Sequence, residues 1–252
     1  MESGTVKTTT QNGIATITFQ HPQSNSLPGS LLAALAGEIT AAGTNPQSSV
    51  IILKSEGEKA FCAGASFDEL ISIKDLETGK KFFSGFAAVI NAMRKAPKFV
   101  LVRVHEKTVG GGVGIAAAGD YCFATESASV KLSELAIGIG PFVVGPAVER
   151  KVGKSAFSQL SINASKWQSA AWAKEKGLYN ELFPTAVEMD KSIDQLAQQL
   201  SASNPEAMTQ LKKITWEGTE NWDSLLLQRA EISGQLVISD FTRNAIAKFK
   251  SK

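Results

Sequence analysis

Two stretches of small residues are the parts of this sequence best suited to chemistry. The first, AFCAGASFDEL, covers residues 60–70, and the second, VGGGVGIAAAGD, covers residues 109–120. Each follows a run that is typical of a strand and leads into a segment that is typical of a helix. Loops with so little side chain let backbone N–H groups approach another molecule. Two such N–H groups that face one point can bind the oxyanion of a reacting carbonyl group.

The glycines also allow two other interpretations. Glycine runs often only let a helix pack closely on a strand. In the second stretch, Gly112, Gly114 and Ala117 fit the G-x-G-x-x-A pattern of dinucleotide-binding proteins. The acidic residue of that pattern would be Glu134, which lies 20 residues beyond Gly114. Only about two turns of helix fit before Asp120, which is short for that pattern. The residues alone therefore leave close packing, an oxyanion hole and a nicotinamide-dependent oxidoreductase open.

Few side chains near these stretches can move protons. Glu134 could act as an acid or base, although a glutamate in a turn is also typical of a protein surface. Cys62 is expected to be a buried small hydrophobe, because no histidine lies in its motif. A Ser-His-Asp hydrolase would need His21 or His105, and the sequence has no G-x-S-x-G elbow. Cys62 and Cys122 lack the spacing of metal ligands, so we expect no metal site.

The elements that must position these stretches alternate between strand and helix. Strand-like runs occupy residues 13–19, 49–55 and 98–104. Apolar residues at helical spacing occupy residues 31–43 and 79–96 between them. This order predicts an α/β layer.

The second half of the chain is expected to be mainly helical. Helical patterns occupy residues 144–153, 154–162, 167–177, 189–203, 205–218 and 223–240. No repeat or low-complexity linker separates the halves. We therefore expect one core domain over residues 1–190 and a helical region over residues 191–252.

Composition and charge exclude several classes of protein. The chain has 252 residues, of which 43% are hydrophobic, and a formal net charge of +2, which suits a soluble globular protein. No stripe of basic residues indicates nucleic-acid binding. The most apolar stretch contains Asp120 and many glycines, so no membrane span is expected. The N-terminus lacks the features of a signal peptide, and we expect a cytoplasmic protein.

The two stretches together resemble the crotonase family, the enoyl-CoA hydratase/isomerase superfamily. The similarity joins AFCAGASFDEL to TVGGGVGIAAAGDYCFATESASVKLSELAIGI, and it runs in order and spacing from about residue 5 to residue 190. It implies a ClpP/crotonase-like spiral of ββα units and a C-terminal helical region that mediates contacts in a trimer, or in a hexamer of two trimers. It also implies acyl-CoA thioester substrates and fatty acid metabolism. Coenzyme A would be present only as part of the substrate, with no separate cofactor.

The resemblance also assigns roles to individual residues. It implies that the N–H groups of Ala65 and Gly111 hold the thioester oxygen, and that Glu134 is the catalytic acid or base. It further implies contacts with the coenzyme A or acyl part of the substrate from Ala63, Gly64, Ser66, Phe67, Gly110, Gly114 and Phe142.

One departure from the family pattern bears on the reaction. Family members that hydrate a double bond carry a second carboxylate at the position of Gly114, and here that carboxylate is missing. A single carboxylate suffices to move a 3-enoyl double bond to the 2-position, so the resemblance favours isomerisation. Hydration, for example of 3-methylglutaconyl-CoA, stays open if Asp68, Glu69 or an ordered water fills the missing role. A scaffold that binds coenzyme A without catalysis is a further alternative.

Overall fold

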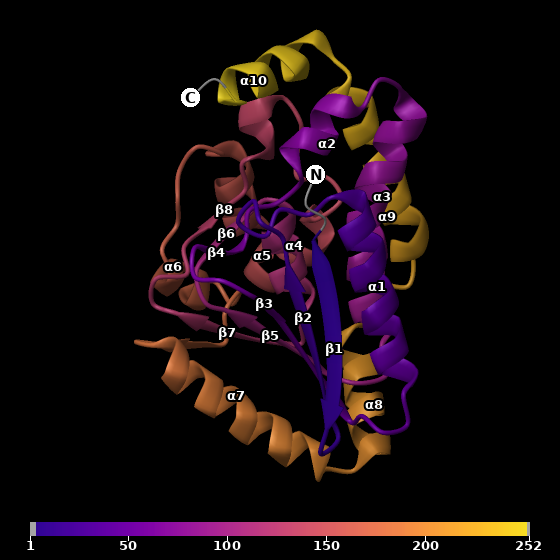
Figure 1. The fold of residues 1–252 in the computed structure, drawn as a ribbon, viewed down its shortest axis with the longest axis vertical. Coiled ribbons are helices and arrows are strands. Elements are labelled where there is room, and N and C mark those ends of the chain that lie inside the picture. Colours follow the sequence, from indigo (N-terminus) through magenta and orange to yellow (C-terminus); the bar gives the residue numbers. More distant parts are fainter. Residues whose placement is uncertain (1–3, 251–252) are drawn as a thin grey trace.

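The computed structural model describes residues 4–250 and contains two sheets surrounded by helices (Figure 1). The larger sheet has the strand order β1-β2-β3-β5-β7-β9. These strands are β1 (Thr5–Gln11), β2 (Ile14–Gln20), β3 (Val50–Ser55), β5 (Val100–Val104), β7 (Tyr121–Thr125) and β9 (Glu181–Phe183). Only β1 pairs antiparallel, with β2, and the other neighbours are parallel.

A smaller parallel sheet positions the two stretches of small residues. It has the order β4-β6-β8, formed by β4 (Ala60–Cys62), β6 (Lys107–Val109) and β8 (Val130–Lys131). Each of these strands follows a strand of the larger sheet and precedes a helix, so the unit ββα repeats three times. Because β4 pairs with β6, the loops that follow these two strands lie side by side. The spiral of ββα units expected from the sequence is therefore present.

Helices cover both faces of the larger sheet. On one face lie α1 (Gly29–Thr44) and α3 (Leu76–Lys95), with α9 (Trp222–Val237) packed on α3, and on the other lies α7 (Ala186–Ser201) (Figure 1). Alternate residues of β3 point to these two faces: Ile51 and Leu53 join the main core, whereas Val50 and Ile52 pack with Met189 of α7. Burial on both faces explains why the parallel strands read as continuous apolar runs.

Seven further helices complete the described part of the chain. They are α2 (Phe67–Ser72), α4 (Gly111–Ala118), the 3₁₀ helix η1 (Glu134–Ile137), α5 (Gly145–Ile162), α6 (Ala170–Glu175), α8 (Pro205–Thr215) and α10 (Asp240–Lys250). The two helices expected over 144–162 are both present within α5, which is interrupted at Gly153, where a φ of 76° is not helical. None of the helices in the described residues is long and apolar enough to cross a membrane.

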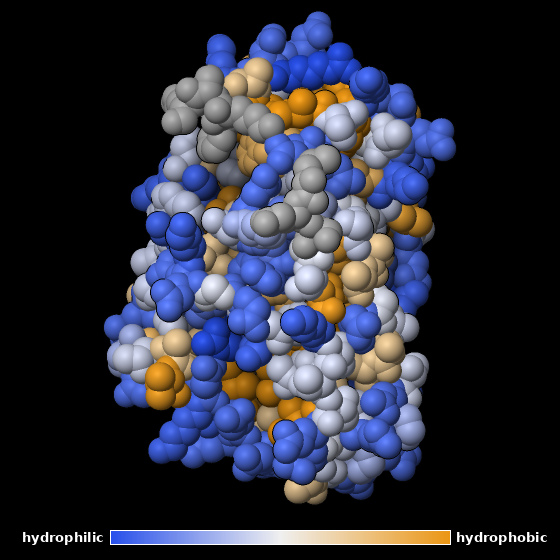
Figure 2. Space-filling view, in the orientation of Figure 1, coloured by the Kyte–Doolittle hydropathy of each residue, from blue (hydrophilic) through white to orange (hydrophobic). Residues whose placement is uncertain are grey.

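The C-terminal helices pack on the core of their own chain. Gly79 of α3 and Gly234 of α9 meet so closely that a Cβ atom on Gly79 would lie 2.9 Å from the Cα atom of Gly234. Figure 2 shows hydrophobic side chains beneath α10, where Leu70 and Ile246 line a groove between α2 and α10.

The trimer or hexamer expected from the resemblance stays a prediction. The domain division expected at residue 190 falls inside α7, which packs on the sheet.

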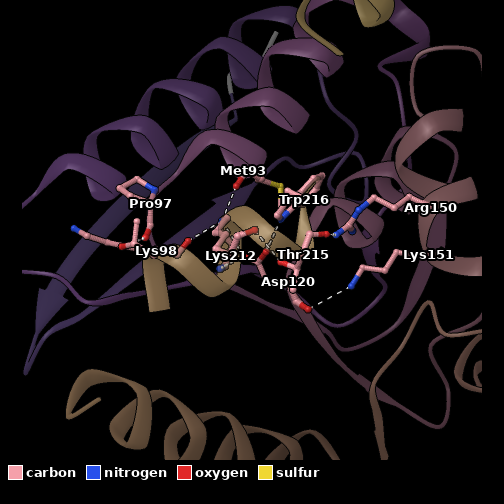
Figure 3. A network of polar contacts seen from close by, with 11 residues as sticks. Met93, Pro97, Lys98, Asp120, Arg150, Lys151, Lys212, Thr215 and Trp216 are labelled. Carbon is pink, nitrogen blue, oxygen red and sulfur yellow. Dashed lines mark hydrogen bonds and ion pairs between the residues drawn. The ribbon is translucent and has the colours of Figure 1, made fainter. Parts of the chain in front are cut away.

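A buried ion pair links α8 to the loop that precedes β7 (Figure 3). Lys212 of α8 has a side chain that is 3% exposed, and its Nζ atom lies 2.8 Å from Oδ2 of Asp120. The same Nζ atom donates hydrogen bonds to the backbone oxygens of Met93 and Lys98. Asp120 also accepts hydrogen bonds from the backbone N–H of Val100 and from the indole of Trp216, as well as from Lys212. Asp120 therefore satisfies these three nearby donors.

This arrangement predicts a large loss of stability when Lys212 is replaced by alanine. The substitution removes the ion-pair partner of buried Asp120 and leaves two backbone carbonyls without a donor, which costs roughly 3–5 kcal/mol. Urea unfolding measures the change. Lys213→Ala, at the exposed neighbouring position, is the matched control and should change the free energy of unfolding by less than about 0.5 kcal/mol. A Lys212→Ala protein as stable as this control would show that the ion pair contributes little.

Candidate active site

The loops after β4 and β6 meet through backbone atoms. A Cβ atom on Gly64 would lie 3.0 Å from the carbonyl oxygen of Val109 and 3.7 Å from the nitrogen of Gly111. Gly64 and Gly110 have φ angles of 89° and 53°, which residues with a Cβ atom rarely adopt. Glycine at these two positions therefore permits both the turns and the close approach.

The backbone N–H groups of Ala65 and Gly111 have no acceptor in the described part of the chain. Their neighbours are engaged: the N–H of Ser66 donates to the carbonyl of Leu27, and the N–H of Gly110 donates to the carbonyl of Lys131. Gly111 is the first residue of α4, where a helix leaves its N–H groups unpaired. Both residues border one cavity, and their free N–H groups can donate hydrogen bonds to a carbonyl oxygen placed there.

Glu134 brings a carboxyl group to the same cavity. It is the first residue of η1, and a Cβ atom on Gly110 would lie 3.1 Å from its Oε1 atom. Its Oε2 atom is buried and has no hydrogen-bond partner among the described residues. Burial raises the pKa of Glu134 to about 7, only partly offset by the hydrogen bond from its own backbone N–H. A carboxyl group with this pKa can both take up and release a proton near neutral pH.

The cavity between these groups has a volume of ≈ 60 Å³. Its lining includes most of the residues expected from the sequence: Ala63, Gly64, Ala65, Phe67, Gly110, Gly111, Glu134 and Phe142. The remaining walls are mainly apolar, with Leu70 from α2 and Phe83 and Phe86 from α3. Cys62, expected to be a buried hydrophobe, is fully buried, and burial raises the pKa of its thiol to about 12.

Two of the expected site residues do not line the cavity. Ser66 begins α2 instead, where its Oγ atom accepts a hydrogen bond from the backbone N–H of Glu69. Gly114 lies inside α4 and packs against Val144, so closely that a Cβ atom on Gly114 would lie 2.4 Å from Cγ1 of Val144. The expected direct contacts of Ser66 and Gly114 with a substrate are therefore not supported by their positions.

The side chains considered for a second carboxylate are also elsewhere. Glu69 accepts a hydrogen bond of 2.6 Å from the backbone N–H of Gly29, at the start of α1. Asp68 accepts a hydrogen bond from the side chain of Gln23. Neither carboxylate lines the cavity, so neither is placed to act beside Glu134.

Several residues of the cavity wall were not predicted from the sequence, among them Val144 and Ser233. Nothing in the sequence pairs Val144 with Gly114. Ser233 comes from α9, far along the chain, and is 1% exposed. Contacts of this kind depend on tertiary packing and have no local signal.

The raised pKa of Glu134 predicts a pH-dependent stability difference between the protein and its Glu134→Gln variant. The folded protein holds a proton on Glu134 up to about pH 7, whereas the unfolded chain releases it near the ordinary glutamate pKa of about 4.3. Between these values, rising pH favours the unfolded parent but not the unfolded variant. The melting temperature of the variant relative to the parent should therefore rise from pH 4.5 to pH 7 and then level off. A difference that is constant over this range would contradict the assignment.

Comparison with known proteins shows which family the chain is similar to. Residues 9–246 match the family model described as enoyl-CoA hydratase/isomerase. A Bacillus subtilis protein named as an enoyl-CoA hydratase/isomerase, YngF, is 31% identical over 211 residues, which cover 82% of this chain and 79% of that protein. A peroxisomal Delta(3,5)-Delta(2,4)-dienoyl-CoA isomerase from Arabidopsis thaliana is 28% identical over 219 residues, which cover 81% and 77% of the two chains.

Solved structures confirm the predicted crotonase-like fold. The crystal structure of an enoyl-CoA hydratase from Bacillus halodurans superposes with a TM-score of 0.88 at 21% identity, covering 96% of this chain and 99% of that one. The glycines of α4 are thus part of this fold and not of a doubly wound dinucleotide-binding fold. The chain belongs to the enoyl-CoA hydratase/isomerase family.

Proposed function

We propose that this protein is an enzyme that binds an acyl-CoA thioester and isomerises 3-enoyl-CoA to 2-enoyl-CoA. The thioester oxygen accepts hydrogen bonds from the N–H groups of Ala65 and Gly111, and Glu134 transfers the proton. Coenzyme A enters as part of the substrate, and the reaction needs no further cofactor. Family membership and the free N–H donors beside Glu134 support this proposal.

The proposed reaction moves one proton and one double bond. The Glu134 carboxylate removes a proton from C2, and the electron pair of that C–H bond passes into a dienolate whose negative charge rests mainly on the thioester oxygen. Glu134, now protonated, returns the same proton to C4, and the double bond then lies between C2 and C3. Two N–H donors at the oxygen lower the energy of the dienolate, because the charge develops where they point.

The observation that carries isomerisation over hydration is the packing of Val144 against Gly114. A second carboxylate at position 114 would need the space that Val144 fills, and Val144 also lines the cavity. Among the cavity-lining residues in the described part of the chain, Glu134 has the only acidic or basic side chain. One carboxylate can shuttle a proton between two carbons, but adding water across a double bond also requires the water to be held and activated.

A side-by-side assay tests the function. The purified protein is offered 3-enoyl-CoA, 2-enoyl-CoA and 3-methylglutaconyl-CoA, and the products are followed by chromatography. We expect conversion of 3-enoyl-CoA, with hydration at least tenfold slower. Faster hydration of either 2-enoyl substrate would instead support a hydratase. Binding of acyl-CoA without turnover of any substrate would indicate a scaffold, and enhanced NADH fluorescence without acyl-CoA binding would indicate an oxidoreductase.

The Val144 contact also predicts how hydration could be introduced. Gly114→Glu alone should destabilise the fold by about 1–3 kcal/mol, because the new side chain overlaps Val144. The double substitution Gly114→Glu with Val144→Gly removes that overlap and should raise the hydration rate of 2-enoyl-CoA at least tenfold above the parent. Val144→Gly alone is the control. An equal gain in that control would show that added space, and not the carboxylate, admits the water.

A further inference from the structure

A second cavity lies on the opposite face of the larger sheet from α3, between the sheet and helices α7 and α8. It has a volume of ≈ 220 Å³, larger than the cavity beside Glu134. Its walls are apolar where Leu101 of β5, Leu196 of α7 and Leu211 of α8 line it. An apolar cavity of about 150 Å³ can already hold a molecule the size of benzene. This second cavity therefore has room for a short apolar chain.

One end of the second cavity carries two cations that form no ion pair with a carboxylate of the described residues. Arg150 and Lys151 of α5 both line it (Figure 3). Arg150 donates a hydrogen bond to the backbone oxygen of Thr215 and lies over the ring of Trp216, 4.0 Å from the ring centroid. Lys151 donates one hydrogen bond of 3.3 Å to the backbone oxygen of Asp120. These contacts leave several N–H groups of both side chains without a protein acceptor among the described residues.

The nearby carboxylate does not balance this charge. Asp120 lines the same cavity, but its two oxygens already accept hydrogen bonds from Lys212, Trp216 and the backbone of Val100. Among the described residues, the cations of Lys212, Arg150 and Lys151 thus lie near a single carboxylate. Burial lowers the pKa of Lys151 and of Arg150, which indicates that each cation is poorly solvated. A charged group in such a place favours a counter-ion.

We propose that the second cavity binds an anion with a short apolar chain, such as a fatty acid of medium length. The anionic head group lies between Arg150 and Lys151, and the chain lies along Leu196, Leu200 and Leu211. This site is distinct from the cavity beside Glu134, because the two share no lining residue. The inference rests on the charge and shape of the second cavity and does not depend on the reaction proposed above.

Isothermal titration with four probes tests the site. Octanoate and octyl phosphate distinguish a carboxylate from a phosphate head group, octanol removes the charge, and acetate removes the chain. We expect octanoate or octyl phosphate to bind at least tenfold more tightly than octanol and acetate. Equal binding of octanol, or no binding of any probe at millimolar concentration, would overturn the proposal. Loss of octanoate binding in the presence of saturating acetoacetyl-CoA would place the probe in the other cavity and overturn it as well.

Three variants locate the bound probe. Lys151→Met should weaken octanoate binding at least tenfold, whereas Lys154→Met, an exposed position on the same helix, should leave it unchanged. Leu211 is 52% exposed, so Leu211→Trp should fold and fill the cavity from its rim, and it should abolish binding. This variant keeps the test decisive if Lys151→Met fails to fold. Unchanged binding in Leu211→Trp would rule out the proposed location.

Discussion

Replacing Glu134 with glutamine is expected to lower the turnover of 3-enoyl-CoA by roughly 10²–10⁴-fold, the range that general acid–base catalysis contributes. Glutamine has the shape of glutamate but cannot take up a proton at neutral pH. The N–H groups of Ala65 and Gly111 are untouched, so the dissociation constant for a saturated acyl-CoA should change by less than about threefold. Steady-state kinetics and isothermal titration measure the two effects separately.

The control for this prediction is Glu126→Gln, at an exposed position after β7. It makes the same chemical change outside the cavity and should leave turnover unchanged. If Glu134→Gln kept more than a tenth of the parent activity, another group would have to carry the proton. If it lost acyl-CoA binding altogether, the Glu134 carboxyl group would be needed for the structure of the cavity and not for proton transfer.

Removing the N–H group of Gly111 is expected to cost about 10²–10³-fold in kcat, as the loss of one oxyanion donor does in other enzymes. Proline is the natural substitution, because it lacks the N–H group and is tolerated at the first residue of a helix. The structure adds a complication: a Cβ atom on Gly111 would lie 2.1 Å from Cε1 of Phe86. The experiment therefore needs Phe86→Ala as its background.

A matched pair of double variants isolates the N–H group. Phe86→Ala with Gly111→Pro lacks the donor, whereas Phe86→Ala with Gly111→Ala keeps it and adds comparable bulk. The ratio of their kcat values reports the donor alone, provided that circular dichroism shows both to be folded. Equal kcat values would remove Gly111 from the proposed oxyanion hole.

Much of the fold and part of the candidate site can be predicted from the sequence because the signals are local. The parallel strands β3 and β5 are continuous apolar runs, and α3 has a clear apolar face that ends before Pro97. Strands β1 and β9 have no such signal: β1 is mostly exposed and rich in threonine, and β9 has only three residues. Their place in the sheet comes from pairing with a neighbour.

The details of the cavity depend on contacts between distant segments. In the structure Ala65, Gly111 and Glu134 border one cavity, and the loops that carry two of them follow paired strands. The motifs implied a shared site for these residues only through the resemblance to the family. They did not predict Val144, whose effect on the cavity arises from a contact with Gly114 in another helix. Ser66 was assigned to substrate binding from its motif position, yet its hydroxyl group is engaged at the start of α2.

The position of Ser233 in the cavity wall has a consequence for the synthesis of the protein. Translation delivers the two glycine loops and Glu134 first, and α9, which carries Ser233 and packs on α3 through Gly234, among the last segments. Synthesis runs from the N-terminus onward, and a domain generally folds as a unit. A nascent chain that ends before α9 therefore contains every proposed catalytic group, but the wall of its cavity lacks Ser233. A premature stop codon that removes only α9 and α10 should abolish activity although every one of those groups has been made.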